Sequence, residues 1–141
     1  MGGPGTHSTN YIDTFITVAP DSAARRGSAP PDREKPSMAA LAFRMLDGHP
    51  YEYTSDDVIF TVWADRHEIA RKDRAKARAT FFSKGQPCLR SSDLAKKYGW
   101  GIHSDAQGRV ALVGVATPEY AAFATGARTV VLKPAMRTTR K

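Results

Sequence analysis

The chain has 141 residues, of which 41% are hydrophobic and 25% are charged, and its formal net charge is +7. This length and composition match one globular domain and argue against a disordered, fibrous or two-domain chain. No apolar stretch approaches the roughly 18 residues that cross a bilayer. The first 20 residues lack a secretory pattern, and the single cysteine, Cys88, excludes an internal disulfide. We therefore expect a cytoplasmic protein that makes no membrane contact.

The charge is distributed unevenly along the chain. Residues 1–65 carry a net charge of −4, residues 66–97 carry +7, and residues 98–141 carry +4. A basic half of this kind favours an anionic partner, such as nucleic acid, a phosphorylated ligand or an acidic protein. A basic helix surface that is merely solvated has the same composition, so the charge alone leaves both interpretations open.

The first 36 residues predict an arm, a strand and a loop. Residues 1–10 are rich in Gly, Pro, Ser and Thr and contain no repeating apolar position, which predicts a disordered arm. Apolar residues alternate with polar ones from Tyr11 to Val18, the period of a half-buried strand. The prolines, mixed charges and small side chains of residues 20–36 predict a long loop.

The middle of the chain predicts two helices and a strand. Ser37 is a suitable N-cap for a helix whose apolar face runs from Met38 to Leu46, and Gly48 is suited to ending it. Residues 58–64 are apolar at alternate positions and largely apolar between them, which predicts a central strand buried on both faces. Residues 69–83 have a helix-favouring composition.

The last third predicts two short helices and three strands. Ser91 or Ser92 caps a helix that runs through Tyr98 and stops at Gly99. Residues 100–103 and 109–115 are expected to be strands of one hairpin. The closing elements are a helix capped by Thr117 with Pro118 in its first turn and ending at Gly126, a strand over 129–133, and a basic tail over 134–141.

This order of elements predicts one α+β domain over residues 11–133. Helices are interspersed among hairpin-linked strands, without the regular strand–helix alternation of a doubly wound sheet. We expect a mainly antiparallel sheet of about five strands with three to four helices.

Six segments also give the chain a resemblance to a known family. They are YIDTFITVAPD at 11–21, PYEYTSDDVIF at 50–60, FFSKGQPCLRSS at 81–92, YGWGIHSD at 98–105, GRVALVGV at 108–115 and AMR at 135–137. In these segments the chain resembles an uncharacterised bacterial family, domain of unknown function 6157. The resemblance covers nearly the whole chain from Asn10 onward, except the 22–35 loop. It implies a single domain and brings no established activity, cofactor or catalytic residue.

The segment from Ser83 to Ser92 concentrates hydrogen-bond donors in a loop that leads into a helix start. The candidate ligand-binding residues here are Lys84, Gln86, Arg90, Ser91 and Ser92. Free backbone N–H groups and a helix dipole at such a place favour an anion. Capping by the serines and a turn at Gly85-Pro87 explain the same residues without a ligand.

Cys88 is the candidate nucleophile of an alternative, enzymatic interpretation. A thiol near a helix start and a cation has a lowered pKa, although a lone cysteine between proline and leucine is also typical of a small buried hydrophobic residue. His103 is the candidate base, with Asp56 or Asp57 to orient it. Ordinary roles at a strand end and in a turn explain these three residues equally well.

A helix followed by a strand commonly returns the chain close to its start. We therefore expect the Ser83–Ser92 segment to share one site with Trp100 and His103.

Metal binding is not expected, because the four histidines lack paired ligand spacing and there is one cysteine. No phosphate loop or dinucleotide fingerprint indicates a cofactor. The sequence thus favours a non-catalytic binding module for an anionic partner, either a phosphorylated small ligand or nucleic acid. The alternatives are a small enzyme that uses Cys88 and His103, and a protein-interaction adaptor. The sequence does not determine the oligomeric state.

Overall fold

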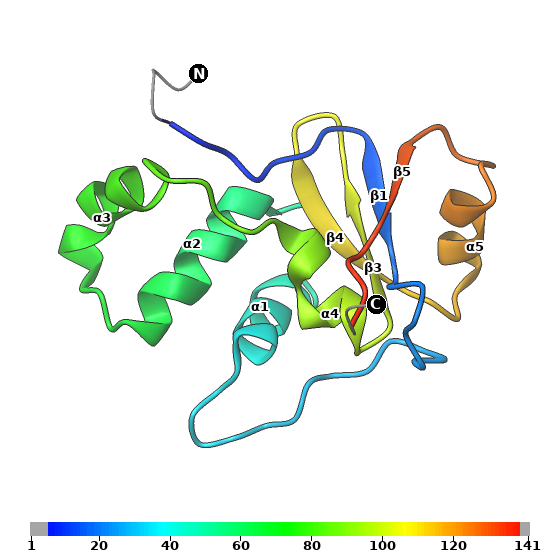
Figure 1. Ribbon diagram of the computed structural model, residues 1–141, viewed down its shortest axis with the longest axis horizontal. Helices are drawn as coiled ribbons and strands as arrows, with labels where there is room; N and C mark the ends of the chain where they lie inside the picture. Colours follow the sequence, from blue (N-terminus) through cyan, green and yellow to red (C-terminus); the bar gives the residue numbers. More distant parts are fainter. Residues whose placement is uncertain (1–5, 139–141) are drawn as a thin grey trace.

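In the computed structural model, which describes residues 6–138, one five-stranded mixed sheet forms the centre of the protein (Figure 1). The strand order is β2-β4-β3-β1-β5, and every neighbouring pair is antiparallel except the parallel pair β1–β5. The strands are β1 (Thr14–Thr17), β2 (Tyr53–Thr54), β3 (Trp100–Ser104), β4 (Arg109–Gly114) and β5 (Val131–Pro134). The predicted α+β fold with a mainly antiparallel sheet is confirmed.

The described residues contain five α-helices, slightly more than the three to four expected. They are α1 (Met38–Leu46), α2 (Ser55–Arg66), α3 (Arg74–Phe81), α4 (Asp93–Lys96) and α5 (Pro118–Ala124). Two 3₁₀ turns, Arg71–Asp73 and Leu89–Ser91, precede α3 and α4. None of these helices is long and apolar enough to cross a membrane.

The sheet separates two hydrophobic cores, because side chains alternate between its faces. Ile16, Ile102 and Val110 point to the larger core, which α1, α2 and α4 cover. Phe15 and Val113 point to the opposite face, where α5 covers them with Phe123. In Figure 1, α1, α2 and α4 accordingly lie on one side of the strands and α5 on the other.

The helix ends that the sequence predicts are formed as expected. The Ser37 hydroxyl accepts a hydrogen bond from the Ala40 N–H at 3.1 Å, and the Thr117 hydroxyl accepts one from the Tyr120 N–H at 3.2 Å. Gly48 and Gly126 have the positive φ angles, 77° and 84°, that commonly follow a helix C-terminus.

The predicted strand over residues 58–64 is wrong, because these residues form the middle of α2. Val58 and Val62 pack in the larger core, whereas Phe60 and Ala64 pack with Phe82 in a separate cluster beneath α3. Each pair is spaced i, i+4 and so lies on one face of a helix. Two such faces, offset by two residues, give the alternating burial that is typical of a strand.

Local capping selects the helix at this position. The Thr54 hydroxyl accepts a hydrogen bond from the Asp57 N–H at 3.1 Å, and the Asp57 carboxylate accepts one from the Thr54 N–H at 3.0 Å. Asp56 and Asp57 also place negative charge in the first turn of α2, where the helix dipole favours it.

The described part of the expected disordered arm is attached to the domain. The His7 N–H donates to the Phe82 carbonyl at 2.8 Å, and Thr9 is buried, with its N–H and hydroxyl both donating to Asp56 at 2.7 Å. The prediction of a disordered arm is therefore wrong for residues 6–10, and residues 1–5 lie outside the described part. The predicted basic tail is also attached up to Thr138, whose N–H and hydroxyl donate to Asp21.

Candidate ligand-binding groove

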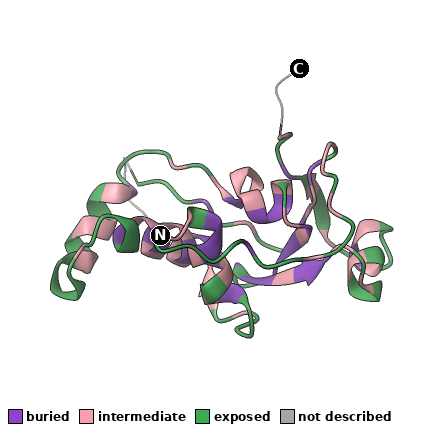
Figure 2. Ribbon diagram, turned by 90° about the horizontal axis from the view of Figure 1, so that it is seen from below, coloured by how far each residue is buried: buried purple, intermediate pink, exposed green. Residues whose placement is uncertain are grey.

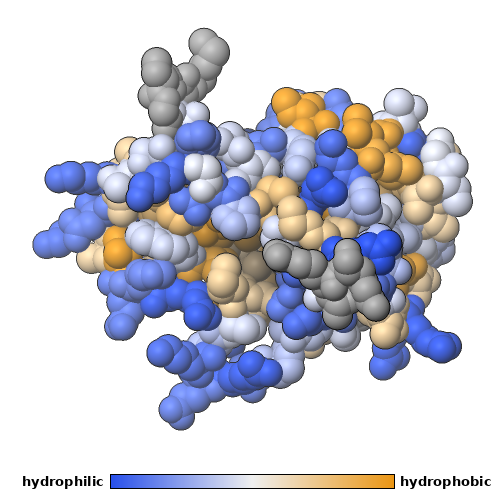
Figure 3. Space-filling model, viewed as in Figure 1, coloured by the Kyte–Doolittle hydropathy of each residue, from blue (hydrophilic) through white to orange (hydrophobic). Residues whose placement is uncertain are grey.

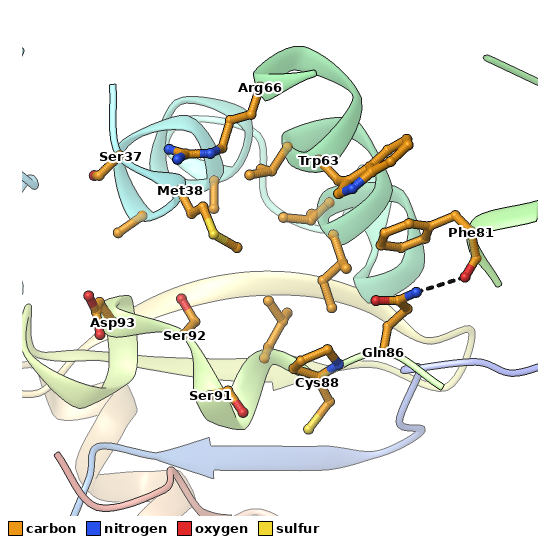
Figure 4. Close-up of a pocket in the computed structure, with 17 residues that line it drawn as sticks. Ser37, Met38, Trp63, Arg66, Phe81, Gln86, Cys88, Ser91, Ser92 and Asp93 are labelled. Carbon is orange, nitrogen blue, oxygen red and sulfur yellow. Dashed lines mark hydrogen bonds between the residues drawn. The ribbon is translucent and has the colours of Figure 1, made fainter. Parts of the chain in front are cut away.

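A groove with a volume of about 470 Å³ lies between α1, α2 and residues 86–93 (Figure 4). Its walls are mostly apolar. They include Ala39 and Ala42 of α1, Val58 and Val62 of α2, and Leu89 of the 3₁₀ turn that precedes α4. The two alanines have short side chains where α1 faces the groove, so that they leave space between the helices and the turn.

Charged side chains gather at one end of the groove, its polar end, and aromatic side chains gather at the other, where Gln86 also lies (Figure 4). Figure 4 shows Arg66 reaching toward Ser37 and Met38 at the start of α1, with Asp93 across from them. Trp63 and Phe81 stand at the opposite end. The groove is therefore amphipathic along its length.

Arg66 and Asp93 lie at the polar end, which forms the mouth of the groove, and their partners differ in charge. Arg66 donates one hydrogen bond, at 3.0 Å, to the neutral carbonyl of Pro36. The Asp93 carboxylate lies 3.8 Å from the Lys97 ammonium group. The negative charge at the mouth thus has a counter-ion, whereas Arg66 forms no ion pair with any residue of the described part.

Of the five predicted donors, Gln86, Ser91 and Ser92 line the groove. Gln86 donates to the Phe81 carbonyl at 2.7 Å, Ser91 donates to the Met136 sulfur at 3.3 Å, and Ser92 accepts from the Leu94 N–H at 3.2 Å. Each side chain therefore already has a partner within the protein. Ser92 is the observed N-cap of α4.

Lys84 and Arg90 do not line the groove. Lys84 is exposed, and the Arg90 Nε donates to the Pro134 carbonyl at 2.7 Å while the Arg90 carbonyl accepts from the Met136 N–H at 2.8 Å. Arg90 therefore holds the C-terminal segment against the domain.

Cys88 lines the groove but does not direct its thiol into it. Its sulfur lies 3.5 Å from the Tyr11 hydroxyl, and Figure 4 shows it pointing away from α1 and α2. The hydrogen bond to Cys88, together with burial, raises the pKa of Tyr11 above its ordinary value.

His103 lies on the opposite face of the sheet from Cys88. Its ring lies 4.4 Å from the Phe123 ring in the α5 core, and its Nδ1 is 2.8 Å from the Tyr51 hydroxyl. Burial, assisted by the positive charge of Arg128, lowers the pKa of His103, and burial raises that of Tyr51. The expected pairing of Cys88 with His103 is therefore wrong, because the sheet stands between them.

Trp100 is also absent from the groove. Its indole N–H donates to the Ser28 carbonyl at 2.8 Å, and its ring packs against Phe43 at 5.8 Å. Trp100 thus holds the long loop that joins β1 to α1. The expected site shared by residues 83–92, Trp100 and His103 does not form.

The two carboxylates proposed to orient His103 instead organise the start of α2. Asp56 binds the N-terminal segment, and the Asp57 carboxylate accepts from the Arg78 guanidinium at 2.9 Å. Burial alone raises the pKa of Asp57, but the hydrogen bonds from Thr54 and Arg78 outweigh it and lower the pKa below its ordinary value.

This lowered pKa predicts a loss of stability in acid. A carboxylate with a depressed folded-state pKa stabilises the fold above its unfolded pKa, and the stabilisation is lost as the pH falls through the folded value. We expect Asp57→Asn to destabilise the protein most above pH 4, with the difference from the unmodified protein shrinking as the pH falls further. Urea unfolding across that pH range measures the difference in free energy of unfolding between the two proteins. The exposed Asp32→Asn is the control, and equal pH profiles for the two variants would contradict the prediction.

The basic segment around α3 is partly neutralised by partners within the domain. Arg74 and Arg78 form ion pairs with Asp65 and Asp57, both at 2.9 Å. The remaining cations, Arg71, Lys72 and Lys76, are exposed. Figure 2 shows α3 without buried residues, and hydrophilic side chains project from this end of the molecule in Figure 3.

Sequence reasoning missed the α2 side of the groove, namely Val58, Val62, Trp63 and Arg66. The predicted strand over residues 58–64 includes Val58, Val62 and Trp63 and ends before Arg66, whereas α2 continues to Arg66 and brings it to the groove with Trp63. The Thr54-x-x-Asp57 spacing was the available signal, because it resembles the capping box of a helix start. Within residues 6–138, no group of three His, Cys, Asp or Glu side chains is placed to hold a metal ion.

Comparison with known proteins identifies the family and nothing narrower. No curated protein and no solved structure matches the chain. A family model described as a family of unknown function, DUF6157, matches residues 6–141, a span that includes the whole groove and all helices and strands of the described residues. The protein belongs to the DUF6157 family.

Proposed function

We propose that this protein is a non-catalytic binding module whose groove holds a small amphipathic organic molecule. The observation that carries the proposal is the groove itself. Its volume of about 470 Å³ falls within the roughly 300 to 1,000 Å³ that is usual for small-molecule sites. Apolar walls with a few polar groups at one end are also typical of such sites.

The arrangement of reactive groups supports binding over catalysis. Nucleophilic catalysis requires a nucleophile and a base within hydrogen-bond reach of each other. The sheet separates Cys88 from His103, and the hydroxyls of Ser37 and Ser92 at the groove act as helix caps.

A nucleic-acid partner is less well supported than a small ligand. Binding to a phosphate backbone relies on several cations presented together. In the α3 region Arg74 and Arg78 are already paired with carboxylates, which leaves Arg71, Lys72 and Lys76 to face a partner. A phosphorylated sugar would leave most of the apolar wall of the groove without a complementary surface.

An adaptor role at the sheet edge is also less well supported. Ile12, Val131 and Leu132 are large exposed hydrophobic residues on or near the edge strand β5. However, β5 has four residues and ends in Lys133 and Pro134, and short strands with lysine and proline resist the addition of another strand.

A fluorescence titration tests the proposed function. The protein has two tryptophans, and only Trp63 lines the groove, so Trp100→Phe leaves a single reporter at the site. We expect the neutral apolar probe N-phenyl-1-naphthylamine to quench Trp63 saturably at one probe per chain. An amphipathic groove should bind such a probe by burying its rings against the apolar walls.

A groove-filling variant links this signal to the site. Ala39→Leu should weaken probe binding by about tenfold, because the added methyl groups occupy the space of the ligand. Ala79→Leu makes the same change on the exposed surface of α3 and should leave binding unchanged. Unfolding curves establish that both variants fold. Absence of saturable quenching, or equal binding by both variants, would overturn the proposed function.

A further inference from the structure

We propose that Arg66 makes the groove selective for a ligand whose polar head is a single anionic group, such as a carboxylate on an apolar chain. This inference rests on the proposed function and names the ligand class of the same site. Arg66 is the last residue of α2, and its side chain lies at the polar end of the groove, near Ser37 and Met38 (Figure 4).

The hydrogen bond of Arg66 positions the guanidinium without neutralising it. Nη1 donates to the Pro36 carbonyl at 3.0 Å, which fixes the side chain across the mouth. A guanidinium has several further N–H donors, arranged to match the two oxygens of a carboxylate. By contrast, Arg44, Arg74 and Arg78 each form an ion pair with an aspartate.

The neighbouring carboxylates do not satisfy this charge. Asp93, across the mouth, pairs with Lys97, and Asp65 pairs with Arg74. Arg66 also lines a second hollow, of about 400 Å³, together with Glu34 and Glu68, and neither of these carboxylates forms an ion pair with it. An anion at the groove mouth would therefore meet a cation that is not already paired.

The start of α1 adds to the same preference. Ser37 caps this nine-residue helix, whose first turn contains no acidic residue, and Ser37, Met38 and Ala39 all line the groove. The partial positive charge of the helix N-terminus thus lies on the same side as Arg66. A single anionic head fits this end, while an apolar chain extends toward Trp63 and Phe81.

Three ligands with one chain length test the head-group preference. Decanoate, decanol and decylammonium, each kept below its micelle concentration, compete for the groove against N-phenyl-1-naphthylamine. We expect decanoate to displace the probe at about tenfold lower concentration than decanol, and decylammonium to be the weakest, because a charge-assisted hydrogen bond favours the anion.

Variants assign the preference to its residue. Arg66→Gln keeps a donor for the Pro36 carbonyl. It should weaken the binding of decanoate to the level of decanol, without changing the binding of decanol. Met38→Asp places a negative charge at the mouth, where the α1 dipole tolerates it, and should weaken the binding of decanoate alone among the three ligands. Arg44→Gln changes an exposed arginine outside the groove and should change nothing.

The outcomes separate the two claims. Equal displacement by all three ligands, or an unchanged decanoate preference in Arg66→Gln, would overturn the head-group assignment and leave the groove as a binding site. Failure of the probe and of all three ligands to bind would overturn the proposed function together with this inference.

Discussion

Replacing Gly99 by alanine is expected to lower the free energy of unfolding by about 2–4 kcal/mol. Gly99 has a φ of +78°, and a Cβ built there would overlap the carbonyl oxygen of Arg26. Backbone atoms do not yield as a flexible side chain does. The 20–36 loop would have to move away, which would strain the 2.9 Å hydrogen bond from the Ser28 N–H to the Tyr98 carbonyl.

Gly48→Ala is the matched control for this prediction. Gly48 has nearly the same φ, +77°, but among the described residues no heavy atom beyond its two chain neighbours lies within 4 Å of its Cβ position. It should therefore lose about 1 kcal/mol, the cost of a left-handed alanine alone. Urea unfolding of both variants compares the two costs. Equal losses would show that the close approach of Gly99 to Arg26 does not constrain the loop.

Replacing Asp56 by alanine is expected to destabilise the protein by about 2–3 kcal/mol and to release the N-terminal segment. The carboxylate accepts hydrogen bonds from the Ser8 hydroxyl at 2.8 Å and from the N–H and hydroxyl of Thr9, both at 2.7 Å. Thr9 is buried, so its N–H would lose its partner without gaining full access to water.

Hydrogen exchange distinguishes this release from a general loss of stability. The Thr9 amide should exchange much faster in Asp56→Ala. The exchange rates of β3 amides should change only as much as the global free energy of unfolding changes. Asp47→Ala removes an exposed carboxylate at the end of α1 and should change stability by less than about 0.5 kcal/mol. Unaltered exchange at Thr9 would contradict the role assigned to Asp56.

Most of the secondary structure could be predicted because its signals are local. The caps at Ser37 and Thr117 and the glycines after α1 and α5 lie within a few residues of the helices they end. The hairpin of β3 and β4 is likewise encoded by two alternating segments and a short polar turn.

The exception, α2, shows where a local pattern has two solutions. Burial at every second residue is typical of a strand, but it also arises when a helix is covered on two faces. In α2, Val58 lies on one covered face and Phe60 on the other. The covering elements come from distant parts of the chain. Periodicity alone therefore does not separate the two structures. The capping residues Thr54 and Asp57 carry the signal that does, and it was missed.

The candidate site could be predicted only in part for a similar reason. Gln86, Ser91 and Ser92 were found from their chemistry, but the face of the sheet on which a loop or helix packs depends on contacts with distant parts of the chain. The segment that contains Cys88 packs on the face covered by α1, α2 and α4, whereas His103 points to the face covered by α5. A count of charges along the sequence likewise does not reveal that Arg78 pairs with Asp57, which lies 21 residues away.

The central claim is that the groove between α1, α2 and residues 86–93 holds a small ligand. The most direct measurement is an NMR titration of the ¹⁵N-labelled protein with decanoate below its micelle concentration. The predicted result is saturable shifts confined to amides of residues 37–42, 58–66 and 86–93. Shifts centred on the cations of residues 71–78 or on His103 and Tyr51, or no saturable shift at all, would contradict it.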